Sequence, residues 1–337
     1  MEAVKKALVT GANGQDASYL LELLVEKGYE VHGTVRRNSV PQSQTMRIQQ
    51  LMDSGALPEH HLHYMDLTDP VSVEHVVTQI MPDEIYHLGA QSHVQISFAL
   101  PKYTLDVNAG GTLAILEAVR RFCPKAKVYH AATSEMFGNC VDPDGFQRET
   151  TPMIPVSPYG ASKLYAHNLC HNYRNAYGIF VCSGILFNHE SVRRGTNFVT
   201  NKVALGAASI SLGLSDKLVL GNLDSYRDWG HARDYVEAMW LMLQQEEPKD
   251  FVIATGKSHS IRDLLDVSFG ELGLDWHNYV ESSERYTRPE ELWALRGDAT
   301  SAKTCLGWQA TVEFEDMIKE MVHFWVDALS NGKEYKY

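Results

Sequence analysis

The feature that most constrains the fold is a short glycine-containing loop between the first apolar run and the first amphipathic run. Lys6–Thr10 has the composition of a strand, and residues 18–27 carry leucines at helical spacing. Between them Gly11, Gly14 and Ala17 form a G-x-x-G-x-x-A pattern. Such a loop lets the backbone approach a pyrophosphate, which then lies at the positive end of a helix. Its position between a strand and a helix favours a dinucleotide site over a plain structural turn.

The following stretches continue the alternation of apolar and amphipathic runs. This pattern predicts an α/β fold, a Rossmann-type doubly wound parallel sheet with a smaller C-terminal substrate-binding lobe. We divide the chain into a dinucleotide-binding domain, residues 1–187, and a second domain, residues 188–337, and allow the chain to cross between them. The expected strands are residues 6–10, 30–35, 63–64, 84–88, 127–132 and 180–187, and the expected helices are residues 18–27, 71–81, 112–122, a helix from 159, 198–212, 233–245, 261–272 and 314–329.

Composition excludes several classes of function. The formal net charge of −12 argues against a nucleic-acid partner, because phosphate backbones require clustered Lys and Arg. The five cysteines show no C-x-x-C spacing, so a zinc or disulfide framework is not expected and a reducing compartment fits best. The chain has no apolar run of membrane-spanning length and no signal-peptide core at its start. We therefore expect a cytoplasmic protein without a membrane partner.

The end of the second strand distinguishes between the two nicotinamide dinucleotides. An acid at this position accepts hydrogen bonds from the ribose 2′-hydroxyl of NAD, whereas arginine suits the 2′-phosphate of NADP. This chain has Arg36 and Arg37 there and no acid. The pair favours NADP, although adjacent arginines are also common in solvated turns. Asp66 and Leu67, after the third strand, are placed to meet the adenine ring.

A second group of residues suggests chemistry at the sheet's C-terminal edge. Tyr159 and Lys163 have the i,i+4 spacing that puts a phenol and an ammonium on one face of a helix. The cation should lower the pKa of the tyrosine, which could then take a proton from a substrate hydroxyl. Thr133 and Glu135 stand upstream at a strand end, and Glu135 offers a second base. A surface Tyr–Lys pair and an exposed acid are the alternatives.

With these residues in view, the chain resembles the GDP-mannose 4,6-dehydratases of the extended short-chain dehydrogenase/reductase type. Thr133, Glu135, Tyr159 and Lys163 match the family's catalytic set, and further matches run from about residue 5 to 325. The motifs that carry the resemblance are D-L-T-D at 66–69, L-G-A-Q-S-H-V at 88–94, S-P-Y-G at 157–160, G-I-L-F-N-H-E-S at 184–191, N-F-V-T at 197–200, R-D-W-G-H at 227–231, the helix at 235–244 and R-P at 288–289.

The resemblance implies an enzyme with tightly held NADP that removes water from a GDP-sugar and works as a homo-oligomer, a tetramer or a dimer. Its catalytic residues would be Thr133, Glu135, Tyr159 and Lys163. The implied cofactor contacts are Gly11, Asn13, Gly14, Gln15, Asp16, Arg36, Arg37, Asp66, Leu67, Leu88, Tyr159, Lys163, His189 and Arg194. The implied substrate contacts are Ser92, Asn188, Glu190, Val199, Lys202, Arg227, Arg288 and Glu291.

The sequence departs from the family pattern T-G-I-T-G-Q-D-G at Ala12, Asn13 and Ala17, and Val192 replaces a usual proline. Residues 39–47 also differ, in a stretch linked to tetramer assembly. A GDP-manno-heptose dehydratase would show nearly the same motifs. A nucleotide-sugar epimerase or reductase would share the Tyr–Lys pair but would not need Glu135, and a regulatory dinucleotide-binding protein would not need all four catalytic residues.

The histidines at 60, 61 and 63 are the remaining candidates for a ligand site. Consecutive and alternate histidines before a strand cannot all face one ion, and no carboxylate–histidine motif accompanies them. We therefore expect no metal.

Overall fold

A parallel sheet of seven strands organises the protein, here described from a computed structural model that covers residues 4–37, 45–283 and 290–332. The strand order is β10-β6-β5-β4-β1-β2-β3, and every pairing is parallel. This confirms the predicted α/β class. The strands are β1 (Lys6–Thr10), β2 (Glu30–Val35), β3 (Leu62–Tyr64), β4 (Glu84–His87), β5 (Lys127–Ala131), β6 (Val181–Leu186) and β10 (Phe251–Ile253).

Helices cover both faces of this sheet because successive side chains of its buried strands alternate between two cores. Ala7 and Val9 pack toward α1 (Gln15–Glu26) and α9 (Ala232–Leu243). Leu8 points the other way, toward the helices α3 (Pro70–Ile80), α6 (Gly111–Phe122) and α7 (Pro158–Tyr177). Each of these five helices overlaps one expected from the sequence.

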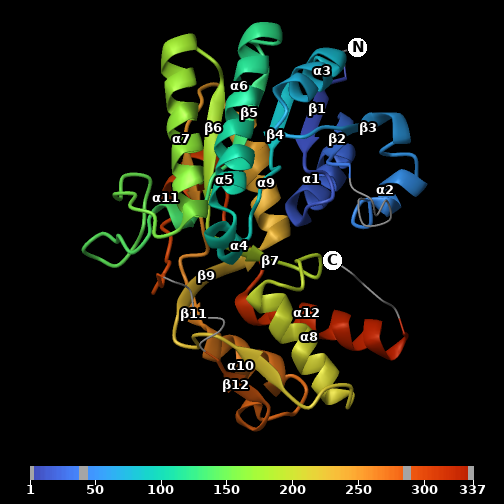
Figure 1. The fold of residues 1–337 in the computed structure, drawn as a ribbon, viewed down its shortest axis with the longest axis vertical. Helices are drawn as coiled ribbons and strands as arrows, with labels where there is room; N and C mark the ends of the chain where they lie inside the picture. Colours follow the sequence, from blue (N-terminus) through green and yellow to red (C-terminus); the bar gives the residue numbers. More distant parts are fainter. Residues whose placement is uncertain (1–3, 38–44, 284–289, 333–337) are drawn as a thin grey trace.

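A smaller lobe lies below the sheet in Figure 1 and has its own apolar core. Its helices α8 (Val199–Ser211), α10 (Ile261–Gly270) and α12 (Phe314–Ser330) pack around buried Trp229 and Trp325. The pair β8 (Leu218–Leu220) and β12 (Val280–Ser282) completes the lobe, and a three-stranded sheet in the order β11-β9-β7 lies between it and the large sheet. Those strands are β7 (Asn188–Glu190), β9 (Tyr226–His231) and β11 (Ser258–Ser260).

The remaining elements are short, and the sequence patterns did not predict them. They connect the main elements or line the sheet's C-terminal edge. They are α2 (Gln49–Asp53), η2 (Glu59–His61), α4 (Val94–Ala99), α5 (Pro101–Leu105), η3 (Asp106–Gly110), η4 (Ser134–Met136), η5 (Trp276–Asn278) and α11 (Thr300–Leu306).

The chain crosses between the two parts more than once. After β6 it enters the small lobe, and it returns for α9 and for β10, which pairs with β6. The return is driven by burial: Met239, Leu243 and Phe251 belong to the core on the α1 face of the large sheet. We keep 1–187 and 188–337 as a proposed division, with residues 232–253 as the stretch that crosses back.

Across the described ranges, no helix is both long enough and apolar enough to cross a membrane.

Candidate active site

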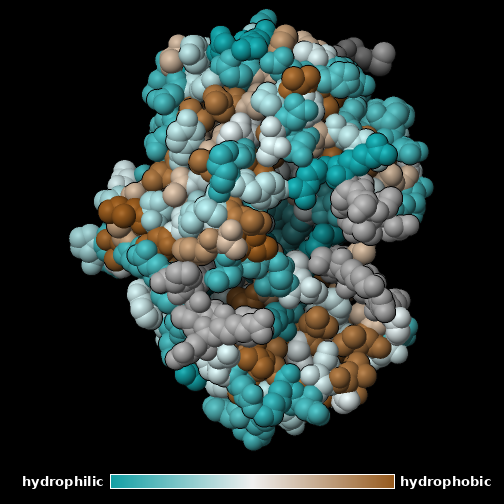
Figure 2. Space-filling view, viewed as in Figure 1, coloured by the Kyte–Doolittle hydropathy of each residue, from teal (hydrophilic) through white to brown (hydrophobic). Residues whose placement is uncertain are grey.

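A cleft of about 690 Å³ separates the C-terminal edge of the large sheet from the small lobe. Figure 2 shows the surface hollowed between the upper and lower parts of the molecule. Residues from both parts line this cleft, as expected for an α/β site at the carboxyl ends of parallel strands. The predicted site residues that line it are Asp16, Leu88, Ser92, Thr133, Glu135, Tyr159, Lys163, Asn188, His189, Glu190, Arg194, Val199, Lys202, Arg227 and Glu291.

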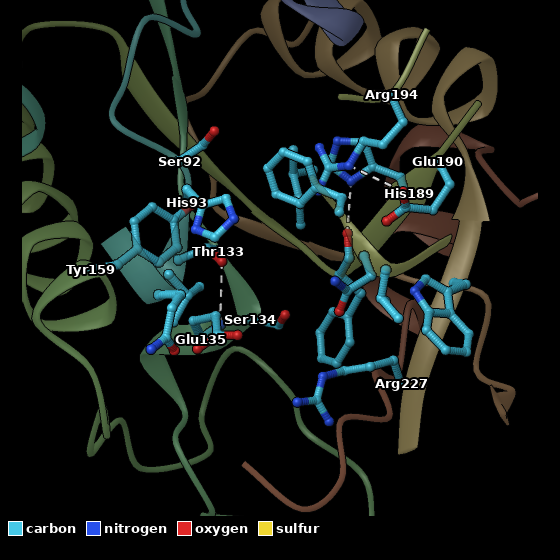
Figure 3. Close-up of a pocket in the computed structure, with 18 of the residues that line it drawn as sticks. Ser92, His93, Thr133, Ser134, Glu135, Tyr159, His189, Glu190, Arg194 and Arg227 are labelled. Carbon is cyan, nitrogen blue, oxygen red and sulfur yellow. Dashed lines mark hydrogen bonds and ion pairs between the residues drawn. The ribbon is translucent and has the colours of Figure 1, made fainter. Parts of the chain in front are cut away.

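The four predicted catalytic residues lie together on the large-sheet wall of the cleft, and all are buried. Thr133 follows β5 and caps the turn η4, where its Oγ1 accepts a hydrogen bond from the Glu135 backbone at 3.3 Å. Tyr159 lies in the first turn of α7. Figure 3 shows Tyr159, Thr133 and Glu135 on one side of the pocket, with His189, Glu190 and Arg194 opposite.

Local sequence explains why Tyr159 lies beside Glu135. Ser157 caps α7 by accepting a hydrogen bond from the Gly160 backbone at 3.0 Å, and Pro158 takes the first helical position. A Cβ on Gly160 would lie only 2.7 Å from the carbonyl oxygen of Glu135, so this glycine lets the first turn of α7 pack against the η4 turn. The S-P-Y-G segment thereby fixes the position of the phenol.

The charges of the Tyr–Lys pair differ from expectation. Burial raises the pKa of Tyr159 to about 12, although a hydrogen bond with Thr133 acts in the opposite direction. Burial also lowers the pKa of Lys163 to about 8, and its Nζ donates to the carbonyl oxygen of Ala131 at 2.7 Å. The expected lowering of the Tyr159 pKa was therefore wrong for this arrangement, because desolvation outweighs the hydrogen bond with Thr133.

A second cavity of about 480 Å³ adjoins the first and matches the predicted dinucleotide site. Gly11 lines it in a left-handed conformation, φ +72°, and a Cβ there would lie 3.0 Å from the Cα of Gly89. Glycine is thus required where the loops after β1 and β4 approach each other. Asp66 and Leu67 also line this cavity. The cradle and the free helix end beside it fit a dinucleotide.

The two predicted phosphate-binding arginines differ in position. Arg36 lines the second cavity, and its Nη1 donates to the hydroxyl of Tyr103. Arg37 is not among the residues lining either cavity, and its guanidinium lies 5.6 Å from the centre of the Tyr64 ring. Arg36 is therefore the better placed of the two to meet a 2′-phosphate.

Three predicted cofactor residues, Asn13, Gly14 and Gln15, are not among the residues that line either cavity. Gln15 instead joins α1 to β7: its Nε2 donates to the His189 carbonyl at 3.1 Å, and its Oε1 accepts from Ser191 Oγ at 2.9 Å. Asn13 accepts a hydrogen bond from the Arg47 backbone at 2.9 Å. Their side chains hold the loop and the neighbouring strand in place.

His189 and Asp16 form an ion pair that also joins α1 to β7. His189 Nε2 lies 2.8 Å from Asp16 Oδ2. Burial opposes both charges, yet the partner's charge and hydrogen bond raise the pKa of His189 and lower that of Asp16. The two directions agree, so each group favours the charged form of the other.

The small-lobe wall carries the predicted substrate contacts. Buried Glu190 accepts a hydrogen bond from Thr200 Oγ1 at 2.6 Å and pairs with Arg194 at 3.0 Å. Lys202 Nζ donates to the Val219 carbonyl at 2.7 Å. Arg227 comes from β9 and Glu291 from the segment after the gap at 284–289. Arg288, another predicted substrate contact, lies outside the described residues.

Sequence reasoning missed the residues that separate the two cavities. The rings of His93 and Phe198 lie 5.4 Å apart, and both residues line both cavities. Each belongs to a motif that carried the resemblance, L-G-A-Q-S-H-V and N-F-V-T. The two residues are more than 100 positions apart in the chain, so the periodicity of the sequence could not predict that they are in contact.

Comparison with known proteins gives a consistent result. The family model described as GDP-mannose 4,6 dehydratase matches residues 8–321. GDP-mannose 4,6 dehydratase 2 of Arabidopsis thaliana is 53% identical and covers 96% of this chain and 87% of its own. The human GDP-mannose 4,6 dehydratase is 48% identical, with coverage of 94% and 90%. The crystal structure of DesIV, a dTDP-glucose 4,6-dehydratase from Streptomyces venezuelae with NAD bound, has a TM-score of 0.83 at 23% identity, with coverage of 98% and 99%. The chain belongs to the GDP-mannose 4,6-dehydratase family.

Proposed function

We propose that this protein is an NADP-dependent GDP-mannose 4,6-dehydratase, which converts GDP-mannose into GDP-4-keto-6-deoxy-D-mannose and acts in nucleotide-sugar metabolism. Family membership over nearly the whole chain supports the reaction. The observation that carries it is the convergence of Glu135 and Tyr159 on one wall of the cleft. Two proton-transfer groups in one site meet the needs of an elimination that follows an oxidation.

Tyr159 is the group that receives the proton of the sugar's C4 hydroxyl. A nicotinamide dinucleotide held in the second cavity would supply the hydride acceptor for C4 and the hydride donor for C6. The Thr133 hydroxyl, hydrogen-bonded to Tyr159, holds the C4 oxygen. Lys163, buried and anchored on Ala131, would in its protonated form offset part of the burial that raises the pKa of Tyr159, and so favour the phenolate that accepts this proton.

Glu135 carries out the elimination. A ketone at C4 acidifies the C5 proton, which the Glu135 carboxylate removes as the C6–oxygen bond breaks. The same proton can then pass to the departing C6 hydroxyl, so that one water is released and Glu135 is restored. The proton that Tyr159 received from the C4 hydroxyl then passes to C5 as hydride returns to C6, which restores Tyr159. The backbone of Glu135 is fixed by Thr133 and by the close packing of Gly160, which holds the carboxylate on the wall shared with Tyr159.

Cations and carboxylates on the opposite wall suit a nucleotide sugar. Lys202 and Arg227 offer positive charge to the pyrophosphate, and Arg288 would add to it. Glu291 is placed for ribose hydroxyls or guanine N–H donors. Residues Ser92, Asn188, Glu190 and Val199 complete the proposed substrate site.

The preference for NADP over NAD rests on the end of β2. Arg36 lines the second cavity beside Thr34 and Asp66, and no acid of β2 stands at the position where the 2′-hydroxyl of NAD would need one. Arg37 adds positive charge nearby. The remaining proposed cofactor contacts are Gly11, Asp16, Asp66, Leu67, Leu88, His189 and Arg194, and we assign Asn13, Gly14 and Gln15 contacts through the backbone of their loop only.

We also propose a cytoplasmic location and a homo-oligomer, a tetramer or a dimer. All five cysteines are free, which suits a reducing compartment. Helices α6 and α7 lie side by side and expose Leu113, Phe122, Tyr165 and Tyr177, apolar side chains that a second copy of the chain could cover.

The proposed function is tested by incubating the purified protein separately with GDP-mannose and with GDP-manno-heptose, with NADP added, and following the mass of each sugar nucleotide. We expect GDP-mannose to lose one water. Loss of water from the heptose alone would change the substrate but keep the reaction. An unchanged mass together with an altered sugar configuration would indicate an epimerase and refute the dehydratase.

A further inference from the structure

Three metal-ligating side chains converge at the outer part of the large sheet, away from both cavities. Glu30 and His32 are two residues apart on β2 and therefore point to the same face of the strand. His61 reaches them from the turn η2. One oxygen of Glu30 and one ring nitrogen from each histidine all lie within 4.8 Å of one another. None of the three lines the active-site cleft or the dinucleotide cavity.

Hydrogen bonds to the backbone and to a neighbouring ring orient both histidines. His61 Nδ1 lies 3.1 Å from the Val31 carbonyl oxygen, which can only accept, so Nδ1 carries the proton and Nε2 keeps the lone pair. His32 Nε2 lies 3.0 Å from Glu30, and its Nδ1 lies 3.1 Å from His63 Nε2. Each histidine thus has a partner for the nitrogen that would not bind the ion, as metal-bound histidines usually do.

In a second cluster of two histidines and one carboxylate, the carboxylate is already bound by other groups of the protein. His167, His171 and Asp250 also bring their ligand atoms together. The Asp250 carboxylate, however, already accepts hydrogen bonds from Arg174 at 2.5 Å and from the Ser183 backbone at 2.6 Å. A cation there would have to displace the Arg174 guanidinium, so this cluster is an ion-pair network.

In the Glu30 cluster the cation that competes with a metal is only weakly held, and the carboxylate is partly exposed to solvent. Lys6 Nζ lies 3.6 Å from Glu30, but its side chain is 42% exposed and can turn into solvent. The Glu30 side chain is 36% exposed, whereas that of His32 is only 9% exposed. An ion can therefore enter from the Glu30 side and meet a histidine held in a fixed position.

We propose that Glu30, His32 and His61 bind one divalent transition-metal ion, Zn²⁺ by preference. Two imidazoles and one carboxylate are a ligand set that zinc accepts, with water in the remaining position. The ion would join β2 to the turn η2 and so fasten the edge of the sheet. This proposal departs from the expectation from the sequence that no metal binds, and of the three histidines at 60, 61 and 63 it uses only His61 as a ligand.

The test uses the full chain with any polyhistidine tag removed, titrated with Zn²⁺ alone by calorimetry. We expect one Zn²⁺ per chain and a higher thermal midpoint in its presence. His61→Ala and Glu30→Gln should each weaken binding by at least ~10-fold, and His63→Ala, which removes only the supporting ring, by about 10-fold. His60→Ala is the matched control, since this neighbouring exposed histidine lies outside the cluster.

Two results would overturn the site: no Zn²⁺ bound by the wild-type chain, or equal affinity in wild type, His61→Ala and Glu30→Gln. Circular dichroism of each variant without Zn²⁺ shows whether it is folded. If His61→Ala does not fold, the Zn²⁺ affinity of Glu30→Gln, whose side chain is 36% exposed, decides whether the site exists. The readout does not involve turnover, so it is independent of the proposed reaction.

Discussion

The two cavities of this protein are built in different ways. The dinucleotide cavity is lined mostly by residues that directly follow β1, β2, β3 and β4, such as Gly11, Arg36 and Leu67. The substrate cleft takes its walls from segments as far apart as Asp16 and Glu291. The first is therefore encoded by local motifs at strand ends. The second exists only once the small lobe has packed against the sheet.

The two regions are also physically tied together. Gln15 and Asp16 start helix α1, which follows the glycine loop of the second cavity, and their side chains bind β7 and Ser191 beside it; β7 carries Asn188 and Glu190 into the larger cleft. Arg193 adds a second tie, because its Nη2 donates to Glu22 of α1 at 2.6 Å. Variants of one region should thus change the affinity for the dinucleotide and variants of the other the affinity for the substrate. Variants of the residues that connect the regions should make this contrast smaller.

The largest effect is expected at Tyr159, the proposed proton acceptor on the wall of the larger cleft. Tyr159→Phe removes the only proton-accepting oxygen of the phenol and should lower turnover by about 10³-fold, within the range for loss of a general acid–base group. Binding of GDP-mannose, followed by calorimetry, should change little. A variant with near wild-type turnover would contradict the role given to Tyr159.

Replacing the arginines after β2 should affect only the dinucleotide. Arg36→Ala should weaken NADP by about 30-fold, since charge-assisted hydrogen bonds to phosphate contribute roughly 2 kcal/mol, while the affinity for NAD should be nearly constant. Arg37→Ala is the natural comparison and should have a smaller effect. Equal losses for NADP and NAD, measured by fluorescence titration, would refute the phosphate contact.

Gln15→Ala tests the tie between the regions. Loss of its two hydrogen bonds to His189 and Ser191, of about 1 kcal/mol each, should raise KM for GDP-mannose by about 30-fold through displacement of β7, with NADP affinity within about twofold. Ser191→Ala removes one of these bonds from the other side and should shift KM in the same direction. If Gln15→Ala instead lowered the affinity for NADP and left KM for GDP-mannose unchanged, the Gln15 side chain would contact the cofactor, as the family motif implies.

The smallest effect is a pH dependence of stability from His189 and Asp16. The raised pKa of His189 gives stability that is complete below its ordinary value and is lost as pH rises through the higher folded value. The lowered pKa of Asp16 gives stability that is present above its ordinary value and is lost as pH falls through the folded one.

The pair should therefore contribute most between about pH 4 and 6.5, by about 1 kcal/mol. The free energy of unfolding is measured with urea from about pH 4 to above pH 6.5. It should decline less above pH 6.5 in His189→Gln than in the wild type. Parallel curves for the two proteins would exclude the pair as the source.

The sequence predicted the fold well where local signals are strong. Lys6–Thr10 and Glu30–Val35 are strands with the predicted bounds, and α12 was predicted to within one residue. Strands β7, β9 and β11 escaped detection, because three to six residues with polar members such as His189 and Asp228 show no clear alternation. They are stabilised by neighbours distant in the chain.

The site shows the same division. Thr133, Glu135 and Tyr159 could be identified from motifs at strand and helix ends, and the structure brings them together. The contact between His93 and Phe198, the role of Gln15 and the pKa of Tyr159 could not, because each depends on burial and on partners up to 176 residues away.

The central claim is that Glu135 makes this fold a dehydratase, and one measurement tests it most directly. GDP-mannose labelled with deuterium at C5 is incubated with wild type and with Glu135→Gln. Mass spectrometry then follows the loss of deuterium and the loss of one water from the sugar nucleotide. We expect wild type to release the label and one water, and Glu135→Gln to bind the substrate but retain both. Release of the label by Glu135→Gln at the wild-type rate would contradict the account.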